Sequence, residues 1–357
     1  MREYESHGIM LPTRIVSMTI VAFGVAATGV GVSSVAASGT PAVVVAPSSG
    51  CVSVDQPVAG NADASWATGC ARLAAYHGRA VWSARAASGG YVLMTVTVGG
   101  ATPVPALASV KPLGVSIGPG IAGHPTAIAS VYSGGRYRIR VYDFATSSVR
   151  TVLPVTSNTS TAPLYPAIAG SLVAYAPSGV VEARKARGPR VCRLGGPCMQ
   201  LPAGPPISGE KLGKSGPRRA GIVGLALVGR KLAMTWLNQD VSAPYSQTLI
   251  LYLPDVLAQR APHYTVVASA AAGGAGSQGA FSPSIAGGSV SYVVGGFACD
   301  FPASPHYIGR WDPRTRRHTR VAAPNVASAV TEGPRTWALS CPPPAIADST
   351  STALSLL

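Results

Sequence analysis

The residues that could do acid–base or nucleophilic chemistry in this chain are few and widely spaced. Its 357 residues include 13 Asp+Glu and 6 His. A hydrolytic or lyase site needs two carboxylates, or a His and a carboxylate, that converge in one pocket. The nearest approach to such a grouping is Asp300 with His306, in an expected loop beside Cys299. The sequence therefore favours a protein without catalytic residues, and a secreted carbohydrate-active or other hydrolytic enzyme stays open as the alternative.

One motif of a catalytic kind occurs at residues 114–118, where Gly-Val-Ser-Ile-Gly matches the G-x-S-x-G of a nucleophile elbow. That motif works because a strand-to-helix turn lifts the serine above a parallel sheet. Pro119 and Gly120 follow at once, so no helix can begin there. We therefore interpret Ser116 as part of a turn. Two G-x-G-x-x-G strings, at 118–123 and 274–279, open no helical segment, and we assign them no ligand.

All six cysteines lie after residue 50, beyond an apolar N-terminal segment. An even number of cysteines in an exported protein predicts disulfides. We expect the pairs Cys192–Cys198, Cys51–Cys70 and Cys299–Cys341. The first of these encloses a Gly-Gly-Pro turn and is the best supported by spacing. No C-x-x-C or paired-His spacing occurs, so neither a metal site nor a cofactor is expected.

The formal net charge is +15, and basic residues gather in two groups. The candidate binding residues are Arg184, Lys185, Arg187, Arg190, Arg193, Lys211, Lys214, Arg218 and Arg219 in the first group, and Arg314, Arg316 and Arg317 in the second. Gly and Pro fill the rest of the first segment, so we expect an exposed loop closed by Cys192–Cys198. Cationic loops attract a protein partner or polyanions such as cell-wall polymers, acidic glycans or lipid headgroups. The alternative is a solvated surface without a partner.

Nucleic acid is the polyanion that the composition favours least. Aromatic residues make up 6% of the chain and do not alternate with the basic runs. The basic segments therefore offer no platform on which bases could stack. We expect no nucleic-acid ligand.

The N-terminus carries an export signal. Residues 15–37 follow Arg14, contain no charge and end in small residues around Val35 and Ala37. This pattern predicts a signal peptide, residues 1–37, cleaved after Ala37. The segment is also long enough to cross a bilayer, so an uncleaved anchor is the alternative and would be the only contact with the membrane. Both alternatives place the rest of the chain outside the cytoplasm, secreted or in the cell envelope.

The elements that position these residues are expected to be strands. The chain contains 41 Gly and 31 Pro, which interrupt nearly every segment, while 47% of it is hydrophobic. Gly and Pro are the two poorest helix formers, so the apolar residues must form a core made of strands.

The chain repeats itself. Pro-x-Ile-Ala-Gly occurs at 119–123, 166–170 and 283–287, and each copy precedes a short alternating apolar stretch. With more divergent copies included, anchor glycines fall at Gly78, Gly123, Gly170, Gly229, Gly288 and Gly333. A second element, residues 137–152, aligns without gaps on 306–321 when Ile139 is set on Ile308, and 246–254 is a weaker third copy. The alignment places Asp143 on Asp312, each after a strand, where Asp caps a turn by accepting backbone N–H groups.

Each unit is expected to contain four strands, and six such units predict a six-bladed β-propeller over residues 38–344. A four-stranded sheet cannot bury both faces alone, and radial packing covers each sheet with its neighbours. The last unit is short, so we expect an N-terminal strand at 42–46 or 51–54 to complete it. The tail, residues 345–357, is expected to be disordered. A β-sandwich is the alternative fold.

These units resemble the TolB-like class of six-bladed propeller repeats found in many secreted bacterial proteins. The resemblance rests on the Pro-x-Ile-Ala-Gly copies and on the stretches 139–143 and 308–312, and it covers most of residues 70–341. The Ser-Pro-Asp-Gly turn usual in TolB repeats is replaced here. The resemblance implies the fold and no particular activity, because propellers host many unrelated functions.

The function that these observations favour is an extracytoplasmic, non-catalytic binding or scaffold module whose basic loops face a protein or polyanionic partner. A membrane-tethered envelope assembly factor is a further alternative if residues 15–37 are retained. An enzyme would place inward-pointing Asp, Glu or His side chains at the central opening, and a binder would show a basic surface around an apolar opening.

Overall fold

The structure is a computed structural model, and the part it describes lies within the unit Val32–Leu357. The described residues are 43–44, 73–86, 88–97, 100–111, 113–151, 164–177, 181–205, 219–239, 245–252, 263–272, 279–286, 288–295, 307–322, 326–332, 335–340 and 354–356. The expected signal peptide or anchor, residues 1–37, lies outside them. None of the described residues belongs to a helix that could span a bilayer.

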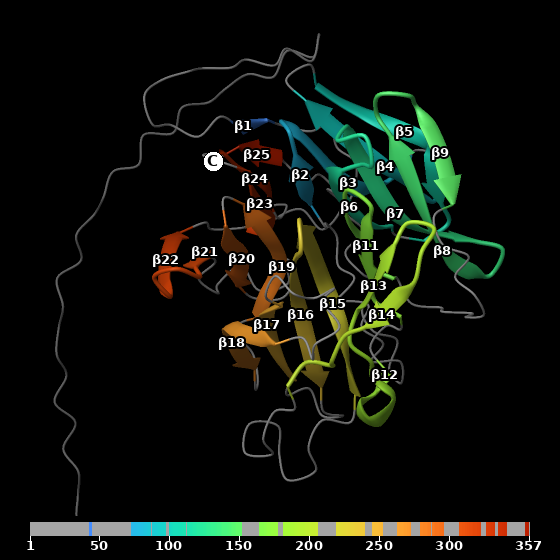
Figure 1. Cartoon of the computed structure of the whole chain (residues 1–357). Helices are drawn as coiled ribbons and strands as arrows, with labels where there is room; N and C mark the ends of the chain where they lie inside the picture. Colours follow the sequence, from blue (N-terminus) through green and yellow to red (C-terminus); the bar gives the residue numbers. More distant parts are fainter. Residues whose placement is uncertain are drawn as a thin grey trace, which may run out of the picture. The chain divides into compact units, whose positions relative to one another are not determined.

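The described residues are all-β, as the sequence predicts, and their strands form six antiparallel sheets (Figure 1). The first sheet contains β2 (Ala74–Tyr76), β3 (Arg79–Arg85), β4 (Tyr91–Thr97) and β5 (Gly100–Ser109). The second contains β6 (Gly114–Pro119), β7 (Pro125–Ser133), β8 (Arg136–Asp143) and β9 (Ser148–Thr151). The third contains β10 (Ala167–Ala169), β11 (Leu172–Tyr175), β13 (Arg190–Arg193) and β14 (Cys198–Gln200).

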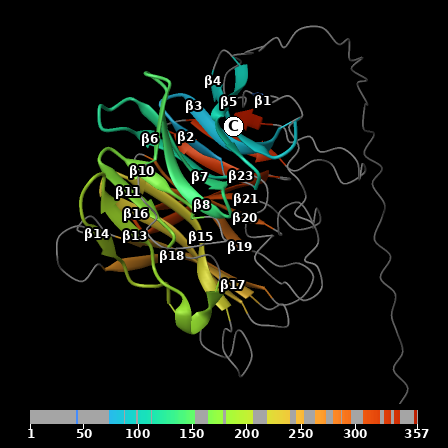
Figure 2. The ribbon, with the colours of Figure 1, turned by 90° about the vertical axis from the view of Figure 1, so that its right-hand side faces the viewer.

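The remaining three sheets follow in chain order (Figure 2). The fourth contains β12 (Val181–Glu182), β15 (Arg219–Val228), β16 (Lys231–Gln239), β17 (Tyr245–Tyr252) and β18 (Tyr264–Ala272). The fifth contains β19 (Gly279–Ala286), β20 (Ser289–Gly295), β21 (Tyr307–Asp312) and β22 (Arg317–Ala322). The sixth contains β23 (Val326–Glu332), β24 (Arg335–Ser340), β25 (Leu354–Leu356) and β1 (Val43–Val44). A short 3-10 helix, η2 (Ala183–Lys185), follows β12.

Neighbouring sheets contact one another through one strand of each sheet. β2 contacts β6, β6 contacts β10, β10 contacts β15, β15 contacts β19, β19 contacts β23, and β23 contacts β2. Alternating apolar residues fill the spaces between neighbouring sheets. Between the first and second sheets, for example, Leu93 and Leu107 pack with Ala127, Ala129 and Val131. Full burial of one such large side chain contributes about 1.5–3 kcal/mol, so these inter-sheet cores hold the sheets together.

Serine side chains tie consecutive sheets by the same kind of bond. Ser83 Oγ, on β3, accepts a hydrogen bond from the backbone N–H of Leu113, which precedes β6, at 3.0 Å. Ser130 Oγ, on β7, accepts one from the backbone N–H of Leu164, which precedes β10, at 3.1 Å. Both bonds satisfy a backbone donor that enters the next sheet, and an unpaired donor there would cost free energy.

The anchor glycines of the repeat occupy equivalent turns. These glycines have φ values of 71° (Gly78), 80° (Gly123), 65° (Gly170), 57° (Gly229) and 84° (Gly288). Four of them lie between the first and second strands of a sheet, and Gly229 lies between β15 and β16 of the five-stranded fourth sheet. Side chains with a Cβ pay a steric cost in this left-handed region, which explains why glycine recurs there. The sixth anchor, Gly333, lies outside the described residues.

One copy of Pro-x-Ile-Ala-Gly differs from the other two in the structure. In the third and fifth sheets its isoleucines, Ile168 and Ile285, lie within the first strand and are 1% and 8% exposed. In the second sheet Pro119 ends β6, and Ile121 lies in the turn that follows, 61% exposed. The strand residue that takes the buried place is Ile117, which pairs with Ala127. The copy at 119–123 therefore forms the end of β6 and a longer turn, with Gly123 in that turn as expected and its isoleucine outside the strand.

The sixth sheet differs from the expected composition. The N-terminal strand β1 falls inside the predicted segment 42–46, but it lies at the outer edge and pairs with β25. The strand next to β24 comes from the tail, where Ala338 pairs with Ser355. The tail 345–357, expected to be disordered, thus contributes β25, because a short alternating Leu-Ser-Leu segment can add to the free edge of β24.

Candidate functional site

A small cavity lies where the first strands of the sheets approach one another. Its volume is about 60 Å³, and it is lined by Leu73, Ala74, Ala75, Val115, Ser116, Ile117, Pro166, Gly224, Leu225, Ala226, Leu227, Val228, Pro283, Ser284, Ile285 and Val330. This volume suits a few water molecules and is far below the several hundred Å³ of a typical ligand pocket. The side chains of its described wall are apolar except for those of Ser116 and Ser284. Ser284 Oγ accepts the backbone N–H of Thr331 at 3.2 Å, which leaves that hydroxyl committed to the fold.

The G-x-S-x-G motif forms a strand. Ser116 lies in the middle of β6, is 7% exposed and pairs with Ile128 of β7. The turn interpretation was wrong, because the turn begins only after Pro119. A serine inside an antiparallel strand lacks the strained strand-to-helix geometry of a nucleophile elbow.

The two repeat-related aspartates cap turns, which confirms that part of the sequence analysis. Asp143 Oδ1 accepts the backbone N–H of Ala145 at 2.8 Å and that of Thr146 at 3.3 Å. Asp312 Oδ1 accepts the backbone N–H of Arg314 at 2.7 Å, and this bond holds the pKa of the Asp312 carboxyl below its ordinary value. Because the charged form makes the bond, both carboxylates are engaged in local structure.

The other two described carboxylates are also engaged. Glu182 Oε2 accepts Arg184 Nε at 2.9 Å and lies 3.1 Å from Lys185 Nζ, and these hydrogen bonds lower the pKa of Glu182. Glu332, at the end of β23, accepts the backbone N–H of Gly78 through Oε1 at 2.9 Å and Oε2 at 3.0 Å. The indole N–H of Trp337 donates to the same carboxylate at 3.4 Å. Glu332 therefore joins the sixth sheet to the first turn of the first sheet.

The first predicted basic group is a hairpin in large part, where a loop was expected. Arg190 and Arg193 are the end residues of β13 and are exposed, while Arg187 lies just before it and is also exposed. Arg184 and Lys185 belong to η2 and pair with Glu182, as described above. Arg219 begins β15 and is half-buried. Lys211, Lys214 and Arg218 lie outside the described residues.

The hairpin forms because Val191 and Cys192 give β13 a buried middle and because Gly195 and Gly196 supply the turn. Gly195 has φ 73°, and the backbone N–H of Gly196 donates to Arg193 O at 2.9 Å. The structure contains the Cys192–Cys198 disulfide expected from the sequence, across a directly paired position of the two strands.

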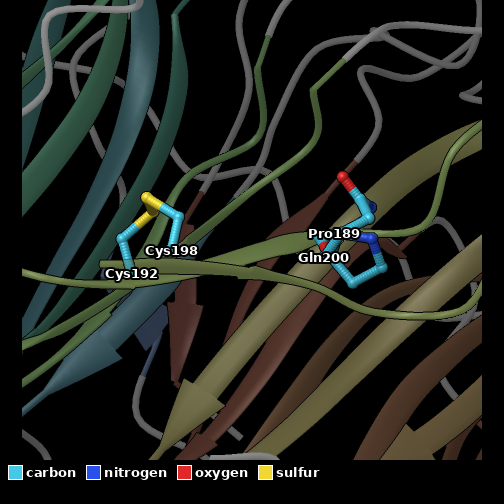
Figure 3. The surroundings of a disulfide bond; sticks show 4 residues. All are labelled: Pro189, Cys192, Cys198 and Gln200. Atoms are coloured by element: carbon cyan, nitrogen blue, oxygen red, sulfur yellow. Dashed lines mark hydrogen bonds between the residues drawn. A yellow bond between two sulfur atoms is a disulfide. The ribbon is translucent and has the colours of Figure 1, made fainter.

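The base of the hairpin is held by a side-chain amide. Gln200 Nε2 donates to Gly188 O, and it lies 3.3 Å from Pro189 O. Figure 3 shows the disulfide toward one end of the hairpin and Gln200 beside Pro189 toward the other. The hairpin is therefore fixed at both ends, and its exposed arginines project from a rigid support. The other expected pairs, Cys51–Cys70 and Cys299–Cys341, lie outside the described residues.

The second predicted basic group surrounds the turn between β21 and β22. Arg314 and Arg316 lie in the turn and Arg317 begins β22, and all three are exposed. On the other face of this hairpin Tyr292 OH lies 2.9 Å from His318 Nδ1. Burial raises the pKa of Tyr292. The two groups lie on different sheets: Arg190 and Arg193 belong to the third sheet, and Arg317 belongs to the fifth.

A third basic group was not singled out from the sequence. Arg136, Arg138 and Arg140 alternate with buried residues along β8 and share one face of the second sheet. The signal was present in the sequence at 136–140, where arginine occupies every second position. Period two on a strand places such residues side by side on one face. Asp300 and His306, the nearest approach to a catalytic pair, lie outside the described residues, and no described His, Cys, Asp or Glu residues gather as metal ligands.

Comparison with known proteins gives structural likeness only. No protein-family model matches the sequence. No curated protein matches it. A nidogen–laminin complex structure is similar with a TM-score of 0.41 and 13% identity, over 70% of this chain and 79% of that chain. A putative TolB from Agrobacterium tumefaciens has a TM-score of 0.40 and 12% identity, over 78% of this chain and 90% of that chain.

A larger protein is also similar over part of its length. PorZ of Porphyromonas gingivalis, a surface component of the type-IX secretion system, has a TM-score of 0.40 and 13% identity. The likeness covers 81% of this chain and 31% of PorZ, so this chain spans about a third of that protein. At these identities and TM-scores the similarities assign this chain neither a family nor an activity.

Proposed function

We propose that this chain is an extracytoplasmic, non-catalytic β-propeller that binds an anionic partner through basic side chains on its outer strands. The partner is a protein or an anionic polymer of the cell envelope. The predicted contact residues are Arg184, Lys185, Arg187, Arg190, Arg193, Lys211, Lys214, Arg218, Arg219, Arg314, Arg316 and Arg317.

The observation that carries the proposal is the use of the acidic side chains. Asp143, Glu182, Asp312 and Glu332 are the acidic residues in the described part of the chain, and each accepts hydrogen bonds that serve the fold. The ion pairs within the described residues are those of Arg184 and Lys185 with Glu182, so the exposed Arg187, Arg190 and Arg193 belong to none of them. An exposed surface of one sign attracts a partner of the opposite sign and accelerates its association.

A closed six-bladed ring is part of the proposal. It is supported by the contacts that run from β2 through β6, β10, β15, β19 and β23 back to β2, and by the cavity that all six sheets line. The bond between Glu332 and Gly78 joins the first and last sheets in the way such a ring requires. Six sheets also exceed the two layers of the β-sandwich alternative.

Export is proposed on the N-terminal pattern and on the disulfide, because structural disulfides persist in oxidising compartments. The mass of the exported protein tests the signal directly. A chain beginning at Ser38 supports cleavage after Ala37. Retention of residues 15–37 supports the membrane-tethered alternative instead.

Binding is tested with the exported chain and inorganic polyphosphate as the polyanion, with neutral dextran as the control polymer. The proposal expects saturable binding of polyphosphate, none of dextran, and an affinity whose logarithm falls linearly with the logarithm of salt concentration. If the exported chain does not bind polyphosphate at low salt, the proposal is contradicted.

The hydrolytic alternative would require acid–base groups at the central opening. The described cavity wall offers apolar side chains and two serines, which supply neither a general acid nor a general base. Turnover of an acidic glycan by the purified chain would favour the enzyme over the binding module.

A further inference from the structure

The second sheet carries a regular line of cations on its third strand, β8. Arg136 and Arg138 are exposed and Arg140 is half-buried, while the residues between them, Tyr137 and Ile139, are buried. The three guanidinium groups therefore extend from the same face of the strand. The position of β8 in the sheet can be followed in Figure 1.

The face that carries these arginines has no acidic residue among its described neighbours. Across β7, Arg140, Arg138 and Arg136 stand opposite Ala129, Val131 and Ser133. Asp143 is the one acidic residue in the described parts of the first two sheets, and strand alternation places it on the opposite face, where it caps a turn. None of the three arginines is paired with a described carboxylate.

Two further cations lie near the ends of β8, Arg79 on the face of the three arginines and Lys111 on the opposite face. Arg79 lies 4.2 Å from the centre of the Phe144 ring, next to the last residue of β8, and partial burial lowers its pKa. Lys111 Nζ lies 4.3 Å from the ring of Tyr132, which pairs with Tyr137 near the beginning of β8. Both contacts are cation–π contacts, and neither neutralises charge.

We infer that β8 binds a linear polyol phosphate, with consecutive phosphodiester groups held by Arg136, Arg138 and Arg140. This inference rests on the proposed function and names the site and the class of ligand. A guanidinium group presents paired N–H donors that match two phosphate oxygens, which a lysine ammonium does not. The positions opposite the arginines on β7 are Ala129, Val131 and Ser133, so no aromatic ring there could stack a base between them. Tyr142, on the same face, lies beyond Arg140 at the end of the strand.

The spacing of the arginines selects the repeat of the polymer. Residues two apart on a strand are separated by six backbone bonds and advance about 6.8 Å. Phosphorus atoms joined through a 1,3-linked three-carbon polyol are also separated by six bonds, P–O–C–C–C–O–P, and advance about 7 Å when extended. A 1,5-linked five-carbon polyol places eight bonds between phosphates and advances about 9 Å, which falls out of register with the arginines by the third contact.

The test compares three forms of the exported chain. One is the unchanged protein, and one carries Arg136→Gln, Arg138→Gln and Arg140→Gln. The matched control carries Arg150→Gln, Arg230→Gln and Lys231→Gln, which removes the same charge from positions away from this face; Arg150 is opposite Val141, on the other side of the sheet. The probes are oligomers of 1,3-linked glycerol phosphate and 1,5-linked ribitol phosphate with equal numbers of phosphates.

The inference expects the unchanged protein and the control to prefer the glycerol phosphate oligomer. It expects the β8 variant to bind that oligomer about 10-fold to 100-fold more weakly and to lose the preference. The slope of log affinity against log salt should fall in magnitude by about 2, for three lost phosphate contacts. Arg→Lys at the same three positions should restore the salt slope but not the preference, which separates phosphate geometry from net charge.

Two outcomes overturn the inference in distinguishable ways. If the β8 variant binds both oligomers like the control, the site is wrong while the proposed function stands. If the unchanged protein binds no polyanion at low salt, the proposed function fails and the site fails with it. Near-ultraviolet circular dichroism and thermal unfolding of the three forms confirm that the exposed substitutions leave the fold intact.

Discussion

Glu332 should hold the sixth sheet to the first, so its replacement should lower the free energy of unfolding of the whole chain. The carboxylate accepts the backbone N–H of Gly78, which is 254 residues away in the sequence, and the indole N–H of Trp337, which is 4% exposed. Glu332→Ala leaves both donors without their acceptor. Loss of a partner for such donors costs about 1–3 kcal/mol, and partial access of water to Glu332 places the expected loss near 1–2 kcal/mol. For a chain of this size that loss lowers the Tm by about 1–3 °C.

The assay is urea and thermal unfolding of the exported chain with its disulfides intact. Glu332→Gln keeps one acceptor oxygen and should fall between the parent and Glu332→Ala. Glu182→Ala is the matched control, because that carboxylate is exposed and contacts only Arg184 and Lys185. Equal stability of Glu332→Ala and Glu182→Ala would refute the reasoning, since the contact between the first and last sheets would then contribute nothing measurable.

Three further predictions concern packing, the hairpin and pH. Gly309→Ala would place a Cβ 2.5 Å from the ring of Tyr292 and should lower the free energy of unfolding by about 1–3 kcal/mol, measured in urea. Unchanged stability would show that the packing of Tyr292 does not require glycine at this position. Replacing Cys192 and Cys198 with serine opens a short loop and should cost up to about 2 kcal/mol. It should also speed amide exchange at Val191 and Met199, the pair next to the disulfide along the two strands, and exchange as slow as in the parent would contradict this. The lowered pKa of Asp312 means that its contribution is present at neutral pH and is lost as pH falls through its folded-state pKa. Asp312→Asn should therefore flatten the acid limb of the stability curve, and an unchanged limb would exclude Asp312 as a contributor.

The repeat could be predicted from the sequence because its physical cause is local. A turn position with φ near +60° to +85° favours glycine. The anchors Gly78, Gly170 and Gly288 could therefore be recognised in the sequence. The aspartate turns were visible for the same reason, since Asp143 and Asp312 bond to backbone groups only a few residues away.

Register and distant pairing could not be predicted in the same way. The motif at 119–123 has the same residues as the other copies, but its Ile121 is exposed. Ile117 is buried instead, so the strand ends nearer the N-terminus than in the other copies. The bond from Gly78 to Glu332 and the pairing of β25 with β24 depend on residues that approach only in the folded chain. A one-residue slip moves every side chain to the other face, so such features need three-dimensional information.

The candidate basic groups could likewise be predicted only in part from the sequence. The basic run with Arg190 and Arg193 was visible by composition, but its strand conformation depends on pairing with Leu172 and Tyr175 of β11. The arginines of β8 alternate with apolar residues in the sequence. The structure adds that the described residues opposite them on β7 are not acidic.

The central claim is that exposed arginines outside the described ion pairs, such as Arg136, Arg138 and Arg190, hold an anionic partner. Arginine-selective dicarbonyl labelling of the exported chain, read by mass spectrometry with and without inorganic polyphosphate, tests it most directly. The claim predicts ready labelling of Arg136, Arg138, Arg190 and Arg317 in the free protein and strong protection of at least one of these groups by polyphosphate. Labelling that is the same in both conditions would contradict it.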